Sequence, residues 1–559
     1  MSISNPNLPK SILALREYTL QAFLHDLLAG ITVGLVALPL AMAFGIASGV
    51  TPQAGLYTAV VAGFLISALG GSRTQIGGPT GAFVVIVAGI VLRFGMSGLA
   101  MVTVMAGVLL LAMGLTGLGA AVRFIPRMVV IGFTNGIAIL IASTQLKDFF
   151  GLKTPPVPSE FLPRIRLLIA HSASLNPAAL WLGLGTLAIL VILPRFTKRV
   201  PASIVALLVC TGVSVVFHLP VETIGSKFGG IPRGFPPFAW PDFHAEHFLP
   251  LIPSAFTVAV LAALESMLSA VVADGMTGDR HNSNVELVAQ GIANIVSPMF
   301  GGIPATGAIA RTATNIRAGA RSPVSGMVHA VTLLLILLVA APLASYIPLA
   351  TLAAVLFVVA YNMGEWNEIG AILQLDTTAI AVWLVTFALT VFADLTVAVG
   401  VGITLAALLY IYRVADTTTV STVTDEYIRD GLPHVLQGRI VPPYVTLLRI
   451  HGPFLWGTTE KLVEATANIE AFEPVVILRL RNMSAIDATG IHAIEAFAQR
   501  LKESGRILLL CGAMEQPSKL LSGGRFQDRI GRENILPNIK AALDRARELH
   551  PAPDAGAED

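Results

Sequence analysis

The chain has 559 residues, of which 54% are hydrophobic and only 13% are charged. Soluble proteins carry about 25% charged residues, so this composition excludes a wholly soluble protein. The formal net charge of +2 gives no indication of nucleic-acid binding. Apolar runs follow one another from about residue 26 to 412, and charged residues become common again after about residue 416. This pattern predicts a membrane domain followed by a soluble domain.

Fourteen apolar segments are candidates for membrane-spanning helices, since a helix needs about 20 residues to cross the hydrocarbon core. In chain order they cover residues 26–47, 54–70, 79–93, 97–118, 125–146, 178–194, 201–219, 252–275, 283–300, 306–318, 322–341, 347–361, 375–392 and 396–413. The third and the tenth are too short to cross alone, and each follows a Gly/Pro-rich stretch. We therefore predict a polytopic α-helical membrane protein with two broken helices.

The basic residues of the short loops predict how these helices are oriented. They follow the even-numbered segments and are Arg73, Arg123, Arg127, Arg195, Lys198, Arg199, Arg280, Arg317 and Arg321. The opposite loops hold almost none beyond Arg93, and the longer connections near 147–177 and 220–250 fall on that side. This asymmetry predicts a bacterial inner-membrane protein with both termini in the cytoplasm. The long polar N-terminus argues against a cleavable signal peptide.

The two broken segments contain the same tripeptide, Thr-Gly-Ala, at 80–82 and at 306–308. With seven segments in each half, the second half is inserted upside down, which is the inverted repeat of many secondary transporters. A half-helix that begins at mid-membrane directs its free N–H groups and about +0.5 of a charge toward the centre. Two such helices predict an anion site built mostly from backbone. The alternative is that Gly and Pro only loosen two packed helices.

Two ionisable residues fall inside the apolar segments. Glu265 lies in the eighth segment with Ser269 one turn later on the same face, and a carboxyl and a hydroxyl there suit a proton or Na+. Arg311 lies in the tenth half-helix and is a candidate fixed charge beside the anion. The alternatives are a protonated, hydrogen-bonded Glu265 and an Arg311 that reaches toward the membrane interface.

The soluble part alternates strands and helices from about residue 440. We expect strands over 444–452, 474–482 and 506–513, and helices over 458–470, 488–505, 515–522 and 537–548, which form a small α/β domain with one sheet. Asp487 is expected to cap the helix that follows it. Cys210 and Cys511 are expected to be small buried hydrophobic residues, with neither a disulfide nor a metal site.

These features together resemble the SulP, or SLC26, family of sulfate-permease anion transporters. The resemblance is carried by VALPLAMAFGIASG in the first segment, ESMLSAVVADG in the eighth and GAIARTATN in the tenth. The tail, with IDATG at a strand–helix turn, resembles the STAS domain of that family. The stretch HNSNVELVAQGIANIVSPMFGG is most similar to the bacterial C4-dicarboxylate carrier branch.

The resemblance implies a core domain of spans 1–4 and 8–11, a gate domain of spans 5–7 and 12–14, and a homodimer. It also implies a substrate between the tips of spans three and ten, beside span one. Glu265 would match the carboxylate position that holds Na+ in bicarbonate-carrying relatives and is linked to proton coupling in others, and Ser269 is the second candidate for the coupling ion because it shares that helix face. The implied substrate-binding residues are Phe44, Thr80, Gly81, Ala82, Phe83, Thr306, Gly307, Ala308, Ala310 and Arg311.

Two positions depart from the family pattern. Leu40 stands where many members have Gln after the span-one proline, so one expected polar contact is missing. Ala488 stands where STAS-like regulators have a phosphorylated Ser, which excludes that switch at this position. The resemblance leaves a cytosolic partner at the STAS domain open, with acyl carrier protein as the example among relatives.

The predicted organisation is a cytosolic segment over 1–25, a transport domain over 26–415, a linker over 416–439, a STAS domain over 440–550 and a disordered tail over 551–559. The predicted function is proton-coupled uptake of a C4-dicarboxylate such as fumarate or succinate. The alternatives are Na+-coupled transport of bicarbonate or sulfate, a membrane-anchored STAS signalling receptor and a nucleobase carrier. We expect no enzymatic activity, cofactor or metal, because the sequence shows no metal cluster, nucleophile–base set or nucleotide loop.

Overall fold

The structure is a computed structural model of the chain. It describes residues 8–15, 18–119, 126–158, 160–197, 201–231, 234–242, 248–393, 395–422 and 441–550. The basic residues Arg123, Lys198 and Arg199, most of the expected linker and the expected tail over 551–559 lie outside these ranges. The chain divides into two compact units, Met1–Ala406 and Ala407–Asp559, and each is described by itself.

The first unit consists of helices. In chain order they are α1 (Lys10–Leu15), α2 (Leu20–Ala47), α3 (Pro52–Leu69), α4 (Phe83–Leu115), α5 (Arg127–Phe150), α6 (Phe161–Ala170), α7 (Pro177–Phe196), α8 (Ala202–Val216), α9 (Ile224–Phe228), α10 (Phe248–Thr277), α11 (Ser283–Val296), α12 (Ile309–Arg317), α13 (Val324–Ala344), α14 (Leu349–Met363), α15 (Trp366–Ile372), α16 (Thr377–Phe392) and α17 (Leu395–Thr417), which continues into the second unit. Eight described helices are long and apolar enough to cross a membrane. All fourteen predicted spans have a helical counterpart.

The third and fourth spans both fall within α4 and are separated by a kink at Gly95, whose backbone is non-helical with φ 67°. The part of α4 before Gly95 is called the α4 half-helix. The third span begins at Phe83 and the tenth at Ile309, a few residues later than predicted. The short helices α1, α6, α9 and α15 were not predicted, because they lie outside the apolar segments. The expected cytosolic segment over 1–25 therefore contains α1 and the first turns of α2.

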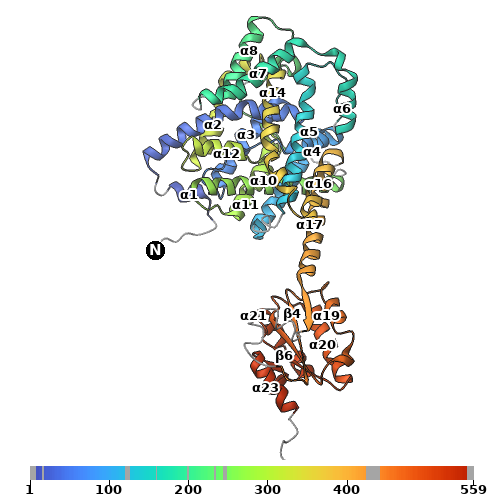
Figure 1. Cartoon of the computed structure of the whole chain (residues 1–559). Coiled ribbons are helices and arrows are strands. Elements are labelled where there is room, and N and C mark those ends of the chain that lie inside the picture. The colour runs from blue at the N-terminus through green and yellow to red at the C-terminus, as the bar shows by residue number, and fades with distance from the viewer. Residues whose placement is uncertain are drawn as a thin grey trace, which may run out of the picture. The chain divides into compact units, whose positions relative to one another are not determined.

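The membrane helices pack as a core domain and a gate domain (Figure 1). In the core, α4 packs against α10 and α11, α2 and α3 pack against α13, and α12 packs against α2 and α10. In the gate, α5 packs against α14 and α16, and α7 packs against α8 and α14. This arrangement confirms the predicted fold class. The tips of α4 and α12 belong to the core, so the core positions the candidate site.

The second unit contains a five-stranded sheet in the order β3-β4-β5-β6-β7. Its strands are β3 (Thr419–Thr422), β4 (Val445–His451), β5 (Val475–Asn482), β6 (Ile507–Cys511) and β7 (Ile535–Leu536), and its helices are α19 (Glu460–Ala465), α20 (Ala488–Glu503), α21 (Glu515–Leu521), α22 (Gly524–Ile530) and α23 (Ile539–Leu549). The pairs β4–β5, β5–β6 and β6–β7 are parallel, and β3 is antiparallel to β4. The predicted strands and helices are confirmed, whereas β3, α22 and β7 were not predicted. Because β3 is an edge strand of this sheet, the start of the expected linker over 416–439 is part of the fold.

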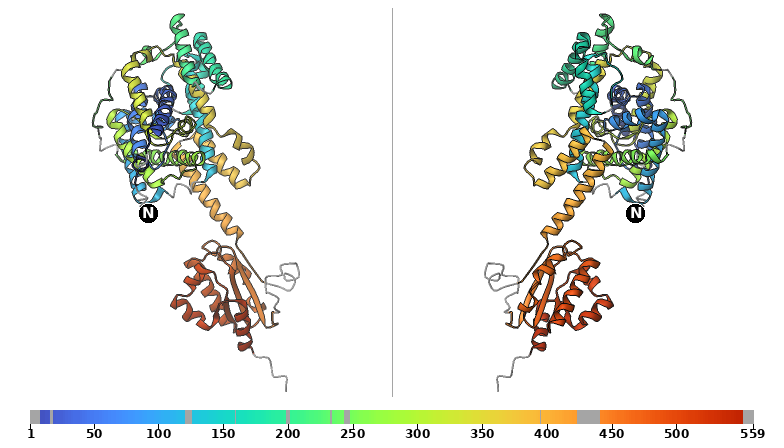
Figure 2. Two further views of the ribbon diagram at one scale, coloured as in Figure 1. Left: turned by 90° about the vertical axis from the view of Figure 1, so that its left-hand side faces the viewer. Right: turned by 90° about the vertical axis from the view of Figure 1, so that its right-hand side faces the viewer.

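Helices cover both faces of this sheet (Figure 2). Along β5, Val476 and Leu478 pack with α20, α21 and α22 on one face, while Val475 and Ile477 pack with α23 on the other. This alternation is what a strand buried on both sides requires. The predicted cap of α20 is confirmed, because Asp487 accepts a hydrogen bond from the N–H of Gly490 at 2.8 Å.

Cys511, at the end of β6, provides a test of this packing. Its side chain is buried against α23, and burial raises the pKa of the thiol to about 12. At pH 9 the thiol of the folded protein should therefore react with iodoacetamide roughly 10³-fold more slowly than that of the unfolded chain. The rate should be measured with the full chain in detergent in a Cys210→Ala background, with and without urea.

The same shift fixes the sign of the pH effect on stability. A thiol with a raised pKa favours folding below its ordinary value near 9 and loses this contribution as the pH rises toward 12. Equal alkylation rates with and without urea would show that β6 and α23 do not pack as described.

Candidate functional site

Two short backbone segments meet where the broken helices begin. The two-residue strands β1 (Gly77–Gly78) and β2 (Thr306–Gly307) form an antiparallel pair. Gly77 lies opposite Gly307, and Gly78 lies opposite Thr306. The N–H of Ala308 donates to the carbonyl oxygen of Ile76 at 2.8 Å. The sequence predicted the two breaks but not this pairing. The pairing holds the N-termini of the two half-helices in one place.

The two half-helices begin at equivalent points of the repeat. Phe83 is three residues after Thr80, and Ile309 is three residues after Thr306. The first N–H groups of a helix have no intrahelical partner and give its N-terminus about half a positive charge. Two such ends beside one another make a region that favours an anion.

Arg311 adds a full positive charge beside these helix ends. It is 3% exposed, and its Nη2 donates to the carbonyl oxygen of Pro79, which connects α12 to the tip of α4. Its Nη1 has no hydrogen-bond partner among the described residues. A Cβ at Gly78 would lie 2.7 Å from this Nη1, so glycine leaves the space that the guanidinium occupies. The free N–H groups of Nη1 are available to an oxyanion.

Glu265 of α10 contacts the residues that precede the α4 half-helix. Its Oε2 accepts a hydrogen bond from the Thr80 hydroxyl at 2.7 Å. Glu265 also lines a cavity of about 20 Å³ against α5, whose wall includes Thr134 and Phe133. Apart from Glu265 and Thr134, the residues around this space are apolar. The carboxyl group therefore lies at the boundary of core and gate, with the tip of α4 on one side and this small space on the other.

Ser269 does not share a contact with Glu265, contrary to what the sequence had suggested. Its hydroxyl contacts the hydroxyl of Thr312 at 3.0 Å, whereas the Glu265 carboxylate accepts from the Thr80 hydroxyl. The two repeat threonines also differ, since the Thr306 hydroxyl contacts that of Ser266 at 2.7 Å. The repeat is thus symmetric in its helix starts and asymmetric in its side-chain contacts.

The remaining predicted residues surround the tip of α4. A Cβ at Gly81 would lie 2.9 Å from Cδ1 of Ile141 and 3.3 Å from Sδ of Met363, which belong to the gate. It would lie 3.4 Å from Cε1 of Phe44, so Phe44 flanks the tip. Ala82 and Phe83 are buried, as is Ala308, whereas Ala310 is exposed on α12.

Several polar residues that sequence reasoning missed satisfy the irregular backbone. The Asn294 side chain bonds both the N–H and the carbonyl of Ala305 at 2.8 Å. The Thr58 hydroxyl accepts from the N–H of Ile303 at 2.7 Å. Gln75 donates to the carbonyl of Ser266, and Ser266 accepts from the N–H of Gly307. In the sequence, each of these residues could have been recognised as a polar residue inside or beside an apolar run.

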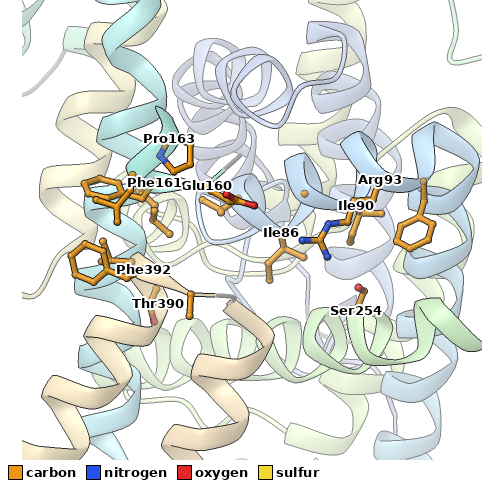
Figure 3. Close-up of a pocket in the computed structure, with 16 residues that line it drawn as sticks. Ile86, Ile90, Arg93, Glu160, Phe161, Pro163, Ser254, Thr390 and Phe392 are labelled. Atoms are coloured by element: carbon orange, nitrogen blue, oxygen red, sulfur yellow. The ribbon is translucent and has the colours of Figure 1, made fainter. Parts of the chain in front are cut away.

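A cavity of about 460 Å³ lies between core and gate and follows the α4 half-helix from Val85 to Phe94. Figure 3 shows Ile86, Ile90 and Arg93 of the core on one wall, and Phe161 and Phe392 among the gate residues on the other. Arg93 and Glu160 both direct their charged ends into this space (Figure 3). The half-helix thus runs from the candidate anion site along this cavity.

Comparison with known proteins agrees with this geometry. Residues 23–386 match the model of the sulfate permease family, and residues 439–545 match that of the STAS domain. The protein described as "Putative sulfate transporter YvdB" of Bacillus subtilis strain 168 is 42% identical, over 93% of this chain and 97% of that protein. The bicarbonate transporter BicA of Picosynechococcus is 31% identical, over 93% and 94%. The solved murine Slc26a9 anion transporter matches with a TM-score of 0.87 at 20% identity, over 97% of this chain and 94% of that one.

Gly307 tests how tightly the two tips pair. A Cβ at this position would lie 1.7 Å from Nε2 of Gln75 and 3.1 Å from Cα of Ser266. Gly307→Ala should therefore destabilise the membrane unit by about 1–3 kcal/mol, as overpacking does. Thermal unfolding of the purified protein in detergent, followed by size-exclusion chromatography, measures this loss.

The matched control is Gly89→Ala. Gly89 lies in the α4 half-helix, and no atom lies within 4 Å of a Cβ built on it. Alanine there should be neutral or stabilising, because it favours helix more than glycine does. Equal melting temperatures for the Gly307 and Gly89 variants would contradict the close approach at β2.

Proposed function

Because the chain belongs to the sulfate permease family and carries a STAS domain, we propose that it moves a small divalent oxyanion by alternating access, together with a proton that binds at Glu265. The family makes it an anion transporter. The identity of the anion, the coupling ion and the roles of individual residues are our proposal. The observation that carries it is the meeting of two half-helix ends with Arg311 and Glu265.

The charge balance at the site favours a dianion when Glu265 is protonated. Two helix ends of about +0.5 each and the Arg311 guanidinium give roughly +2. An ionised Glu265 lowers this to roughly +1. Binding a proton at Glu265 therefore strengthens the attraction for a dianion. This linkage is what couples a proton to the anion in a symporter.

The substrate candidates follow from this balance. Sulfate and C4-dicarboxylates such as fumarate and succinate are dianions and fit the protonated site. Bicarbonate carries one charge and fits the site with Glu265 ionised. The bicarbonate transporters among the relatives are 31% and 32% identical, so bicarbonate is the second candidate. The dicarboxylate prediction comes from the sequence resemblance alone.

A proton is favoured over Na+ by the oxygen atoms around Glu265. A hard cation needs several oxygen ligands at once. The described hydrogen-bond partner of the Glu265 carboxylate is Thr80, while Ser269 contacts Thr312. A carboxyl group with one hydroxyl neighbour and an otherwise mostly apolar cavity wall suits a proton better.

Alternating access here is a movement of the core against the gate. The tip of α4 touches the gate at Ile141 and Met363 through Gly81, so the anion region lies at the boundary of the two domains. The cavity beside Arg93 offers a route to the site from the side opposite the predicted cytoplasmic loops. We further propose the bacterial inner membrane with both termini in the cytoplasm, and a homodimer.

The STAS domain leaves one alternative of another class, in which the chain is a signalling receptor whose tail binds a cytosolic protein such as acyl carrier protein. A receptor does not require two opposed half-helices with a buried guanidinium between core and gate. We therefore favour transport and treat a STAS partner as a possible regulator of it.

The first test is uptake by proteoliposomes that contain the full chain. Labelled sulfate, succinate, fumarate and bicarbonate should be offered with pH and Na+ gradients imposed separately. We expect an inward proton gradient to drive accumulation of a dianion and a Na+ gradient to drive none. Glu265→Gln should abolish this accumulation and retain exchange, because Gln keeps the site neutral without releasing a proton. Glu368→Gln, at a gate surface ion pair with Arg127, is the control.

Unchanged pH-driven uptake by the Glu265→Gln variant would remove the coupling role from this residue. Accumulation driven by Na+ alone would favour the bicarbonate alternative. No uptake of any of the four anions, together with tight binding of a cytosolic protein, would favour the receptor.

Arg311 is tested by substrate affinity. Arg311→Ala should weaken anion binding about 10- to 100-fold, since a charged hydrogen bond contributes roughly 1.5–3 kcal/mol. The Kd of Arg311→Lys should lie between those of the wild type and Arg311→Ala, because lysine keeps the charge and loses the planar guanidinium. Calorimetric titration measures the Kd, and Arg317→Ala, at an exposed position on the same helix, should bind normally. An unaltered Kd for Arg311→Ala would leave Arg311 with the structural bond to Pro79 only.

A further inference from the structure

A second large cavity lies between the core and the gate, away from the candidate anion site. Its volume is about 460 Å³, and its walls come from α8 of the gate and from α2, α3 and α13 of the core. Leucine, isoleucine, valine, methionine and alanine make up most of the lining. Among the described residues that line it, Thr211 and Tyr346 are the ones with a side-chain hydroxyl. Such a wall selects an apolar occupant.

The cavity opens on the side of the protein that faces the membrane. Leu208 of α8 and Leu343 of α13 line it and are 65% and 68% exposed. Both residues lie on apolar helices, α8 and α13, so the medium at the mouth is hydrocarbon. The surrounding medium therefore supplies acyl chains and little water.

One end of the cavity lies near a membrane interface. α13 ends at Ala344, and Tyr346, which follows it, lines the cavity and is 55% exposed. Tyrosine favours the level of the lipid headgroups, where its ring is apolar and its hydroxyl is wet. A chain that enters beside Tyr346 thus extends inward along α13 and α8.

We propose that this cavity binds one acyl chain of a phospholipid, inserted between α8 and α13 with its headgroup at the level of Tyr346. The cavity is lined by both domains, so its shape changes when the core moves against the gate. The chain then favours the domain arrangement that it fits better and shifts the equilibrium by that difference. The binding rests on the fold, whereas the effect on transport rests on the proposed function.

Photolabelling tests the binding directly. The full chain is reconstituted with phosphatidylethanolamine that carries a diazirine in one acyl chain, irradiated and analysed by peptide mass spectrometry. We expect more label on residues 207–215 of α8 and 336–344 of α13 than on the lipid-facing surface of α7. Even labelling of α7, α8 and α13 would overturn the proposal.

A filled cavity provides the second arm. Gly212 lines it, and no atom lies within 4 Å of a Cβ built there, so Gly212→Leu starts a side chain in open space and takes up part of the cavity. Labelling of α8 and α13 should then fall roughly tenfold, as expected when several methylene contacts are lost. Gly185→Leu on α7 is the matched control, since Gly185 is equally open and lies outside the cavity.

Failure of the acyl-chain proposal can be distinguished from failure of the transport proposal, because photolabelling does not depend on anion uptake. A second copy of the chain on this face would protect it from label and would let Gly212→Cys form a disulfide-linked dimer, which overturns the acyl-chain proposal. Unchanged labelling in Gly212→Leu would do the same. If labelling follows the prediction and the variant transports no anion, the lipid site stands and the transport proposal is tested by the anion panel.

Discussion

The need to satisfy backbone polar groups at membrane depth governs this structure. In hydrocarbon, an unpaired N–H or carbonyl group costs several kcal/mol, so irregular backbone is tolerated only where protein or water satisfies it. The chain meets this demand at residues 75–82 and 301–308 with the β1–β2 pair and with buried polar side chains such as Asn294, Thr58 and Ser266. The broken helices exist only because the surrounding helices carry these groups.

The same constraint explains why charge gathers at one point. Helix ends that are free of backbone partners are positive, and Arg311 reaches them through the carbonyl of Pro79. Glu265 comes close through the hydroxyl of Thr80. A buried acidic group beside a basic one is stable in either protonation state only if a ligand or a proton can compensate. An anion and a proton are two species that can do so, and this is the basis of the proton coupling that we propose for this anion transporter.

The sequence predicted the architecture well because hydropathy and loop charge act over long segments. The fourteen spans and the strand–helix order of the STAS domain come from such averages, whereas the inverted repeat comes from the Thr-Gly-Ala that recurs at 80–82 and 306–308. The sequence did not predict β1–β2, since a two-residue pair between Gly77 and Gly307 leaves no periodic signal. The sequence also did not predict the hydrogen-bond partner of Ser269. A face shared with Glu265 on one helix does not reveal that Thr312 of α12 approaches closer. Edge strand β3 was not predicted because its four residues lie inside the stretch expected to be a linker.

The β1–β2 contact also constrains how the protein is made. The bond between the N–H of Ile76 and the hydroxyl of Thr312 joins residues that are 236 positions apart. Such long-range contacts form late, after the loop between them has closed. During synthesis the first repeat must therefore wait in the membrane with its Gly-rich segment unpaired until the tenth span has been inserted.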